Sequence, residues 1–139
     1  MKFYSFNGIA FSSELPLPEL VTTTGESTIH IQWGRVPESL ANPVRRGVCY
    51  ELNEEEFLIR IPQTVSFWIR QGRQIQIDPA DQADERTIRM FLYTSPFGAL
   101  FHQRDLFPFH ASAVETERGA VLFSGASGTG KTTIAAGFV

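Results

Sequence analysis

Cysteine is almost absent from this sequence. Cys49 is the single cysteine among 139 residues, so no disulfide can form within the chain. A reducing compartment is the simplest expectation. Because Val48 and Tyr50 flank Cys49, we expect a packed thiol and not a nucleophile. The opening segment Met1–Gly8 lacks the apolar core of a signal peptide, and we therefore predict a cytoplasmic protein.

Long apolar runs and basic clusters are also missing. No window approaches 18 apolar residues, so we predict no membrane-spanning segment and no membrane partner. The net charge is −3, and the longest basic cluster is Arg45-Arg46, in a segment from Val36 to Gly47 that we expect to be a loop. Nucleic-acid binding requires a basic face, so we do not expect a nucleic-acid partner.

One glycine-rich stretch matches a known ligand-binding pattern. Residues 125–132 read Gly-Ala-Ser-Gly-Thr-Gly-Lys-Thr and fit the phosphate-binding pattern G-x-x-x-x-G-K-[ST]. The apolar run Ala120–Ser124 before it is predicted to be a buried parallel strand, and Thr133–Ala136 after it is predicted to start a helix. Strand, glycine-rich turn and helix together form the context that such a loop needs.

The residue types in this stretch suit ATP and Mg²⁺ as cofactors. The glycines permit backbone angles that turn N–H groups inward as an anion-binding nest. Lys131 is predicted to contact the β- and γ-phosphates as the catalytic residue, and the Thr132 hydroxyl is predicted to bind Mg²⁺. The predicted cofactor-binding set is Gly125, Ala126, Ser127, Gly128, Thr129, Gly130, Lys131, Thr132 and Thr133.

The upstream residues predict an α+β domain. A hairpin is expected at residues 3–12 around Asn7-Gly8, and a rigid extended connector at Leu15–Leu20 because of its two prolines. A strand is expected at Thr28–Trp33, with Ile29, Ile31 and Trp33 on its buried face and His30 at the surface. Val48–Asp78 predicts a four-stranded antiparallel meander.

A helical segment is predicted to cover that meander. Apolar residues at positions 88, 91, 92, 99 and 100 form one stripe of an amphipathic helix. Pro96 either kinks this helix or starts a second one after Ser95. The aromatic side chains of this segment are expected to be core: Phe91, Tyr93, Phe97 and Phe101.

The run Leu106–Val114 with the loop at Gly125–Thr132 resembles bacterial HPr kinase/phosphorylase-related proteins. In those proteins a strand with a histidine, matched here by His110, pairs beside the phosphate-loop strand. The upstream half is similar to HPr kinase-like proteins of modified-peptide gene clusters, some of which resemble peptide-serine kinases of lasso-peptide pathways. The resemblance implies a phosphotransferase of the phosphoenolpyruvate-carboxykinase-like type. Ser112, two residues after His110, is not expected to act as a nucleophile with it, because no acid partner is evident.

These observations lead to one preferred function and two alternatives. We expect an α+β recognition domain at residues 1–105, followed at 106–139 by the first strand, loop and helix of an α/β kinase core. The chain is then part of an ATP-dependent protein or peptide serine kinase. We expect the native protein to extend past Val139 to supply a catalytic base and a second metal ligand, so that this chain alone is inactive. The alternatives are a module that binds a peptide at a sheet edge with a vestigial loop, and an ATPase without phosphorylated product. Uncovered apolar surface predicts self-association as a further option.

Overall fold

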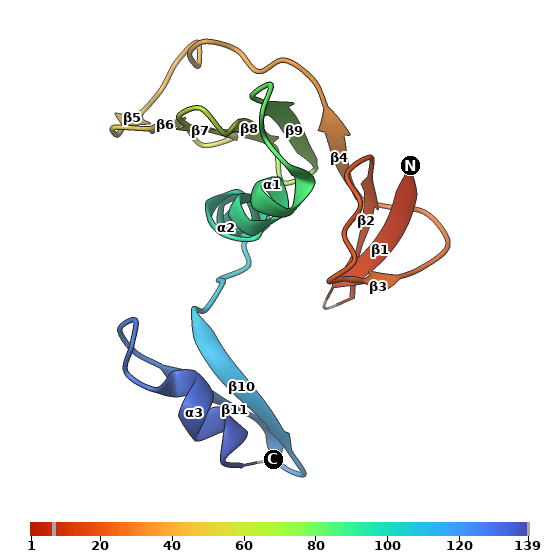
Figure 1. The fold of residues 1–139 in the computed structure, drawn as a ribbon, viewed down its shortest axis with the longest axis vertical. Helices are drawn as coiled ribbons and strands as arrows, with labels where there is room; N and C mark the ends of the chain where they lie inside the picture. The colour runs from red at the N-terminus through yellow and green to blue at the C-terminus, as the bar shows by residue number, and fades with distance from the viewer. Residues whose placement is uncertain (7, 139) are drawn as a thin grey trace. The chain divides into compact units, whose positions relative to one another are not determined.

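The computed structural model describes residues 1–6 and 8–138. The chain divides into two compact units, Met1–Leu106 and Phe107–Val139 (Figure 1). The first unit is mixed α+β, with a large sheet and two short helices. None of the described helices is long and apolar enough to cross a membrane.

Among the described residues, the first unit contains one nine-stranded sheet. The strand order is β3-β1-β2-β4-β9-β8-β7-β6-β5, and every neighbouring pair is antiparallel except β2–β4 and β4–β9. The strands are β1 Lys2–Phe6, β2 Ile9–Ser13, β3 Val21–Thr22, β4 Ile29–Trp33, β5 Arg45–Arg46, β6 Tyr50–Leu52, β7 Glu56–Ile61, β8 Val65–Arg70 and β9 Gln74–Pro79.

The predicted meander is confirmed. Strands β6, β7, β8 and β9 pair in sequence order and are antiparallel. Val65, Phe67 and Ile69 of β8 are buried and alternate with half-buried residues, as expected when one face of a sheet packs against the core. The predicted hairpin is also confirmed, since β1 and β2 pair antiparallel. Gly8 has φ +77°, as a tight turn requires, whereas Asn7 lies outside the described residues.

The segment Leu15–Leu20 is part of the core, and its prediction as a connector is therefore incomplete. Leu15 and Leu17 are completely buried, and the Leu17 N–H donates to Tyr4 Oη at 3.0 Å. Arg89 Nε and the Tyr93 hydroxyl donate to the Glu19 carboxylate at 3.1 and 3.0 Å. The prolines keep this segment out of regular structure, but its leucines still bury apolar surface.

The predicted kinked helix is a bent helical segment made of two helices. Helix α1 spans Glu85–Leu92 and helix α2 spans Ser95–His102. Asp84 caps α1, because its carboxylate accepts from the Thr87 N–H. Pro96 lies in the first turn of α2, where its missing N–H removes no helical hydrogen bond.

The aromatic residues of this segment belong to the core, as predicted. Phe97 is buried and stacks on Phe11, with ring centroids 5.5 Å apart. The rings of Tyr93 and Phe101 meet Phe97 edge-on at 5.3 and 5.7 Å. Phe91 is partly buried against the same core.

Three predictions for single positions are wrong. Cys49 is exposed, because it lies in a bend just before β6. Trp33 is 37% exposed although Ile29 and Ile31 of the same strand are buried, since it occupies the last position of β4. Arg45 and Arg46 form the short exposed strand β5 and are not in a loop. His30 is at the surface as predicted, with its Nδ1 2.7 Å from Ser12 Oγ.

Candidate phosphate-binding loop

The second unit places the glycine-rich loop between a strand and a helix. Strands β10 Ala111–Thr116 and β11 Gly119–Ser124 pair with each other, and α3 Lys131–Ala136 contacts both. The loop Gly125–Gly130 links β11 to α3. The helix begins at Lys131 and not at Thr133 as predicted, so Lys131 and Thr132 lie in its first turn.

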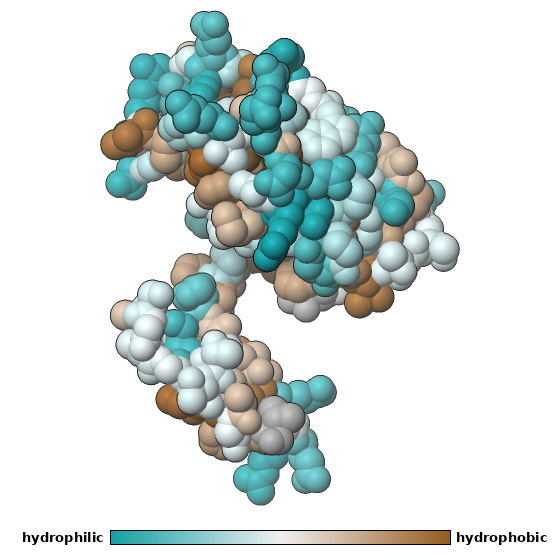
Figure 2. Space-filling view, viewed as in Figure 1, coloured by the Kyte–Doolittle hydropathy of each residue, from teal (hydrophilic) through white to brown (hydrophobic). Residues whose placement is uncertain are grey.

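The prediction that Ala120–Ser124 forms a buried parallel strand is wrong, because the strand is neither parallel nor buried. The β11 strand runs antiparallel to β10, because only the two-residue turn Glu117–Arg118 separates them. Val121 and Leu122 of β11 are both exposed, although successive residues of a strand point to opposite faces, so neither face of β11 is buried at these positions. Figure 2 shows hydrophobic residues at the surface of this unit. The described residues therefore hold a strand–loop–helix but no parallel sheet around it.

The loop conformation depends on two of its glycines. Gly128 and Gly130 have φ +83° and +81°, in the left-handed region that residues with a Cβ avoid. A Cβ added at either glycine would meet no atom within 4 Å, so backbone conformation and not crowding favours glycine there. At Gly125 the reason is steric, because a Cβ would lie 3.0 Å from Thr129 Oγ1.

The loop presents several backbone donors that no protein group uses. Thr129 closes the turn, with its N–H and its hydroxyl directed at the Ala126 carbonyl at 3.4 and 2.8 Å. Within the described part of the chain, the N–H groups of Ser127, Gly128 and Gly130 have no hydrogen-bond partner. Successive unpaired N–H groups in a tight turn are the donors that bind a phosphate group.

Lys131 returns over the loop from the start of α3. Its Nζ donates to the Gly125 and Ala126 carbonyl oxygens, both at 3.0 Å. The ammonium charge is thereby held beside the free N–H groups of the loop, on a half-buried residue. Backbone donors and a cation at one place favour a doubly or more highly charged anion.

The hydroxyl predicted to bind Mg²⁺ has a second hydroxyl beside it. Thr132 is exposed at the start of α3, and its Oγ1 lies 3.4 Å from Ser112 Oγ of β10. No group of three or more His, Cys, Asp or Glu residues that could hold a metal occurs among the described residues. The donor set fits Mg²⁺ carried by nucleotide phosphates, since this ion keeps waters and takes few protein ligands.

The remaining predicted residues of the second unit are exposed. His110 is exposed and precedes β10, so it is not on the strand where we predicted it. Thr133 is exposed in α3, and Ser127 is exposed in the loop. In the sequence, Ser112 stands out only as a possible nucleophile two residues after His110. The structure instead brings it to Thr132, which strand alternation alone could not have indicated, because the contact depends on how α3 packs on β10.

Comparison of the chain with protein-family models, with curated proteins and with solved structures found no match.

Proposed function

We propose that this chain is a P-loop nucleotide-binding protein whose second unit binds the phosphates of ATP with Mg²⁺. More specifically, we propose that it forms the recognition and phosphate-binding part of an ATP-dependent protein or peptide serine kinase. The observation that carries the proposal is the loop itself. Its sequence fits the phosphate-binding pattern, and its free N–H groups lie beside the Lys131 ammonium.

Each residue then has a defined part in phosphate binding. The free N–H groups of Ser127, Gly128 and Gly130 donate to phosphate oxygens, and Lys131 neutralises negative charge on the β- and γ-phosphates. Thr132 holds Mg²⁺, which supplies further charge neutralisation when bound, and Ser112 positions the Thr132 hydroxyl. Phosphoryl transfer depends mainly on positioning and charge neutralisation, which are the contributions these residues can make.

Calorimetric titration of the chain with ATP in the presence of Mg²⁺ tests nucleotide binding. A charge-assisted hydrogen bond contributes about 1.5–3 kcal/mol, so Lys131→Ala should weaken ATP binding by roughly 10- to 150-fold. Lys131→Arg keeps the charge and should lose less. ATP binding that is unchanged in Lys131→Ala would refute the proposed role of the loop.

A second assay separates the kinase from its alternatives. The product of the native gene is incubated with ATP and a serine peptide, and phosphopeptide is measured by mass spectrometry alongside released phosphate. Phosphoserine that depends on Lys131 supports the kinase. Phosphate release without phosphopeptide indicates an ATPase, and absence of ATP binding together with peptide binding indicates the peptide-binding module.

A further inference from the structure

The second unit has no buried core of its own. Among its described residues, 107–138, none is buried, and each one is half-buried or exposed. The first unit is different, because all buried members of its hydrophobic core lie between Tyr4 and Leu100. The first unit therefore holds its fold by packing of its own side chains, whereas the second unit lacks the buried apolar surface that stabilises folded proteins.

The elements of the second unit are too short to be stable on their own. Within the described part of the chain, β10 and β11 pair only with each other, and α3 has six residues. A lone two-stranded hairpin is marginally stable in water, and so is a helix of fewer than about 12 residues. Units below about 40 residues usually need a disulfide, a metal or a partner. The single cysteine, Cys49, belongs to the first unit, and the described residues offer no metal-binding cluster.

The apolar contacts of the second unit leave most of their surface in water. The rings of Phe107 and Phe109 lie 5.0 Å apart, yet these residues are 75% and 64% exposed. The ring of Phe138 lies 5.4 Å from that of Phe123, and Phe138 is 66% exposed. Hydrophobic stabilisation is roughly proportional to the apolar area removed from water, so these contacts contribute little. We expect the folding free energy of this unit to be close to zero.

The proposed phosphate site exists only when this unit is ordered. The free N–H groups of Ser127, Gly128 and Gly130 lie in one short loop whose two ends are fixed by β11 and α3. Lys131 reaches this loop from the first turn of α3, where its Nζ donates to the Gly125 carbonyl oxygen. In an unfolded chain these donors are dispersed, so ATP has little affinity for it. A ligand that binds only the ordered form shifts the population toward that form.

We propose that Mg²⁺-bound ATP orders the second unit. Without nucleotide, residues 107–138 are largely unfolded, and on binding they take up the strand–loop–helix that the structure shows. This inference rests on the proposed function, which assigns ATP to the loop. Its consequence is that the apparent ATP affinity is reduced by the fraction of chains whose second unit is ordered. ATP affinity then depends on the stability of β10, β11 and α3, and not on the loop residues alone.

Hydrogen–deuterium exchange of the full chain, read by mass spectrometry of its peptides, tests the proposal. Without nucleotide, the backbone amides of β10, β11 and α3 should exchange nearly as fast as in an unfolded chain. With Mg²⁺ and ATP at about 100 times Kd, the same amides should exchange about 100-fold more slowly. Amides of β8 and β9 in the first unit should be equally protected in both conditions, because the core of that unit does not depend on nucleotide.

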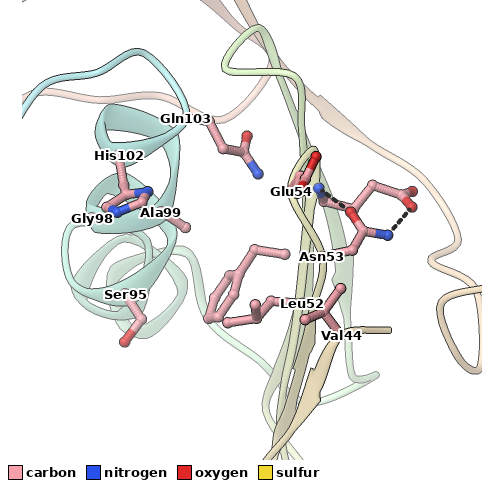
Figure 3. A pocket seen from close by; sticks show the side chains of 11 residues that line it. Val44, Leu52, Asn53, Glu54, Ser95, Gly98, Ala99, His102 and Gln103 are labelled. Carbon is pink, nitrogen blue, oxygen red and sulfur yellow. Dashed lines mark hydrogen bonds between the residues drawn. The ribbon is translucent and has the colours of Figure 1, made fainter. Parts of the chain in front are cut away.

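A helix variant outside the loop tests the coupling to ATP affinity. Ala135 is half-buried in α3, and Ala135→Gly lowers helix stability without altering any loop residue. This variant should weaken ATP binding about three- to fivefold in calorimetric titration. Ala99→Gly is the matched control, since Ala99 is half-buried in α2 of the first unit, where it lines a pocket between α2 and strands β6 and β7 (Figure 3). The control should bind ATP like wild type.

Two outcomes would overturn the proposal while ATP still binds. The first is slow exchange of β10, β11 and α3 in the absence of nucleotide, and the second is wild-type ATP affinity in Ala135→Gly. If this slow exchange depends on protein concentration, a second copy of the chain orders the unit in place of ATP. Failure of the proposed function looks different. The second unit would then exchange rapidly with and without ATP, Lys131→Ala would exchange like wild type, and the inference would fail with it.

Discussion

The left-handed glycines of the loop allow a sharp test of how phosphate binding depends on backbone conformation. Gly128 has φ +83°, and a Cβ at this position would meet no atom within 4 Å. Alanine at Gly128 therefore incurs a conformational cost, not a steric one. For a residue with a Cβ, the left-handed conformation costs about 1–2 kcal/mol. If ATP binds only this conformation, Gly128→Ala should weaken ATP binding by about 5- to 30-fold.

Asparagine provides the matched control at the same position. It adopts the left-handed conformation more readily than alanine, because its side chain can hydrogen-bond locally. Gly128→Asn should therefore bind ATP more tightly than Gly128→Ala, although its side chain is larger. The assay is calorimetric titration with ATP and Mg²⁺, with urea unfolding to verify that each variant is folded. Equal losses of ATP affinity in both variants would show that the presence of a side chain, and not its tolerance of the left-handed conformation, weakens binding. Wild-type ATP affinity in Gly128→Ala would refute the conformational argument.

Three further predictions concern the core, the helix cap and the metal site. Leu17→Ala removes a completely buried side chain and should lower the free energy of unfolding by about 2–5 kcal/mol in urea denaturation, whereas a change below about 1 kcal/mol would contradict the core assignment. The Thr87 hydroxyl and N–H donate hydrogen bonds to the Asp84 carboxylate and lower its pKa. The cap therefore stabilises α1 fully when the pH is above the ordinary aspartate pKa of about 4. This stabilisation is lost as the pH falls through the lowered pKa of Asp84. Asp84→Asn should remove this part of the pH dependence of unfolding, and an unchanged pH profile would contradict it. Ser112→Ala should raise the Mg²⁺ concentration needed for ATP binding by up to about tenfold, whereas an identical Mg²⁺ titration would exclude a positioning role.

Local patterns in the sequence were sufficient to predict the meander, the first hairpin and the helical segment that covers the sheet. Alternating apolar residues in β8 and β9 place Phe67, Ile69, Ile75 and Ile77 on one face, and short turns force neighbouring strands to pair antiparallel. Pro96 indicated the position at which the helical segment bends. The loop at Gly125–Thr132 was also recognisable from sequence, since its pattern specifies residue types at fixed spacing.

Contacts between distant segments were decided only by the tertiary structure. The parallel pairing of β4 with β2 and β9 joins strands that no short turn connects, so no local signal specifies it. Likewise, Leu15 and Leu17 are buried because the sheet and α1 enclose their segment, although its prolines indicate only an extended chain. A pocket beside Gly98 lies along one face of α2, between this helix and β6 and β7, and the proximity of Ser112 to Thr132 arises from the packing of α3 on β10. Sequence determines conformation over a few residues through backbone and side-chain preferences, whereas the sites depend on how the resulting elements pack together.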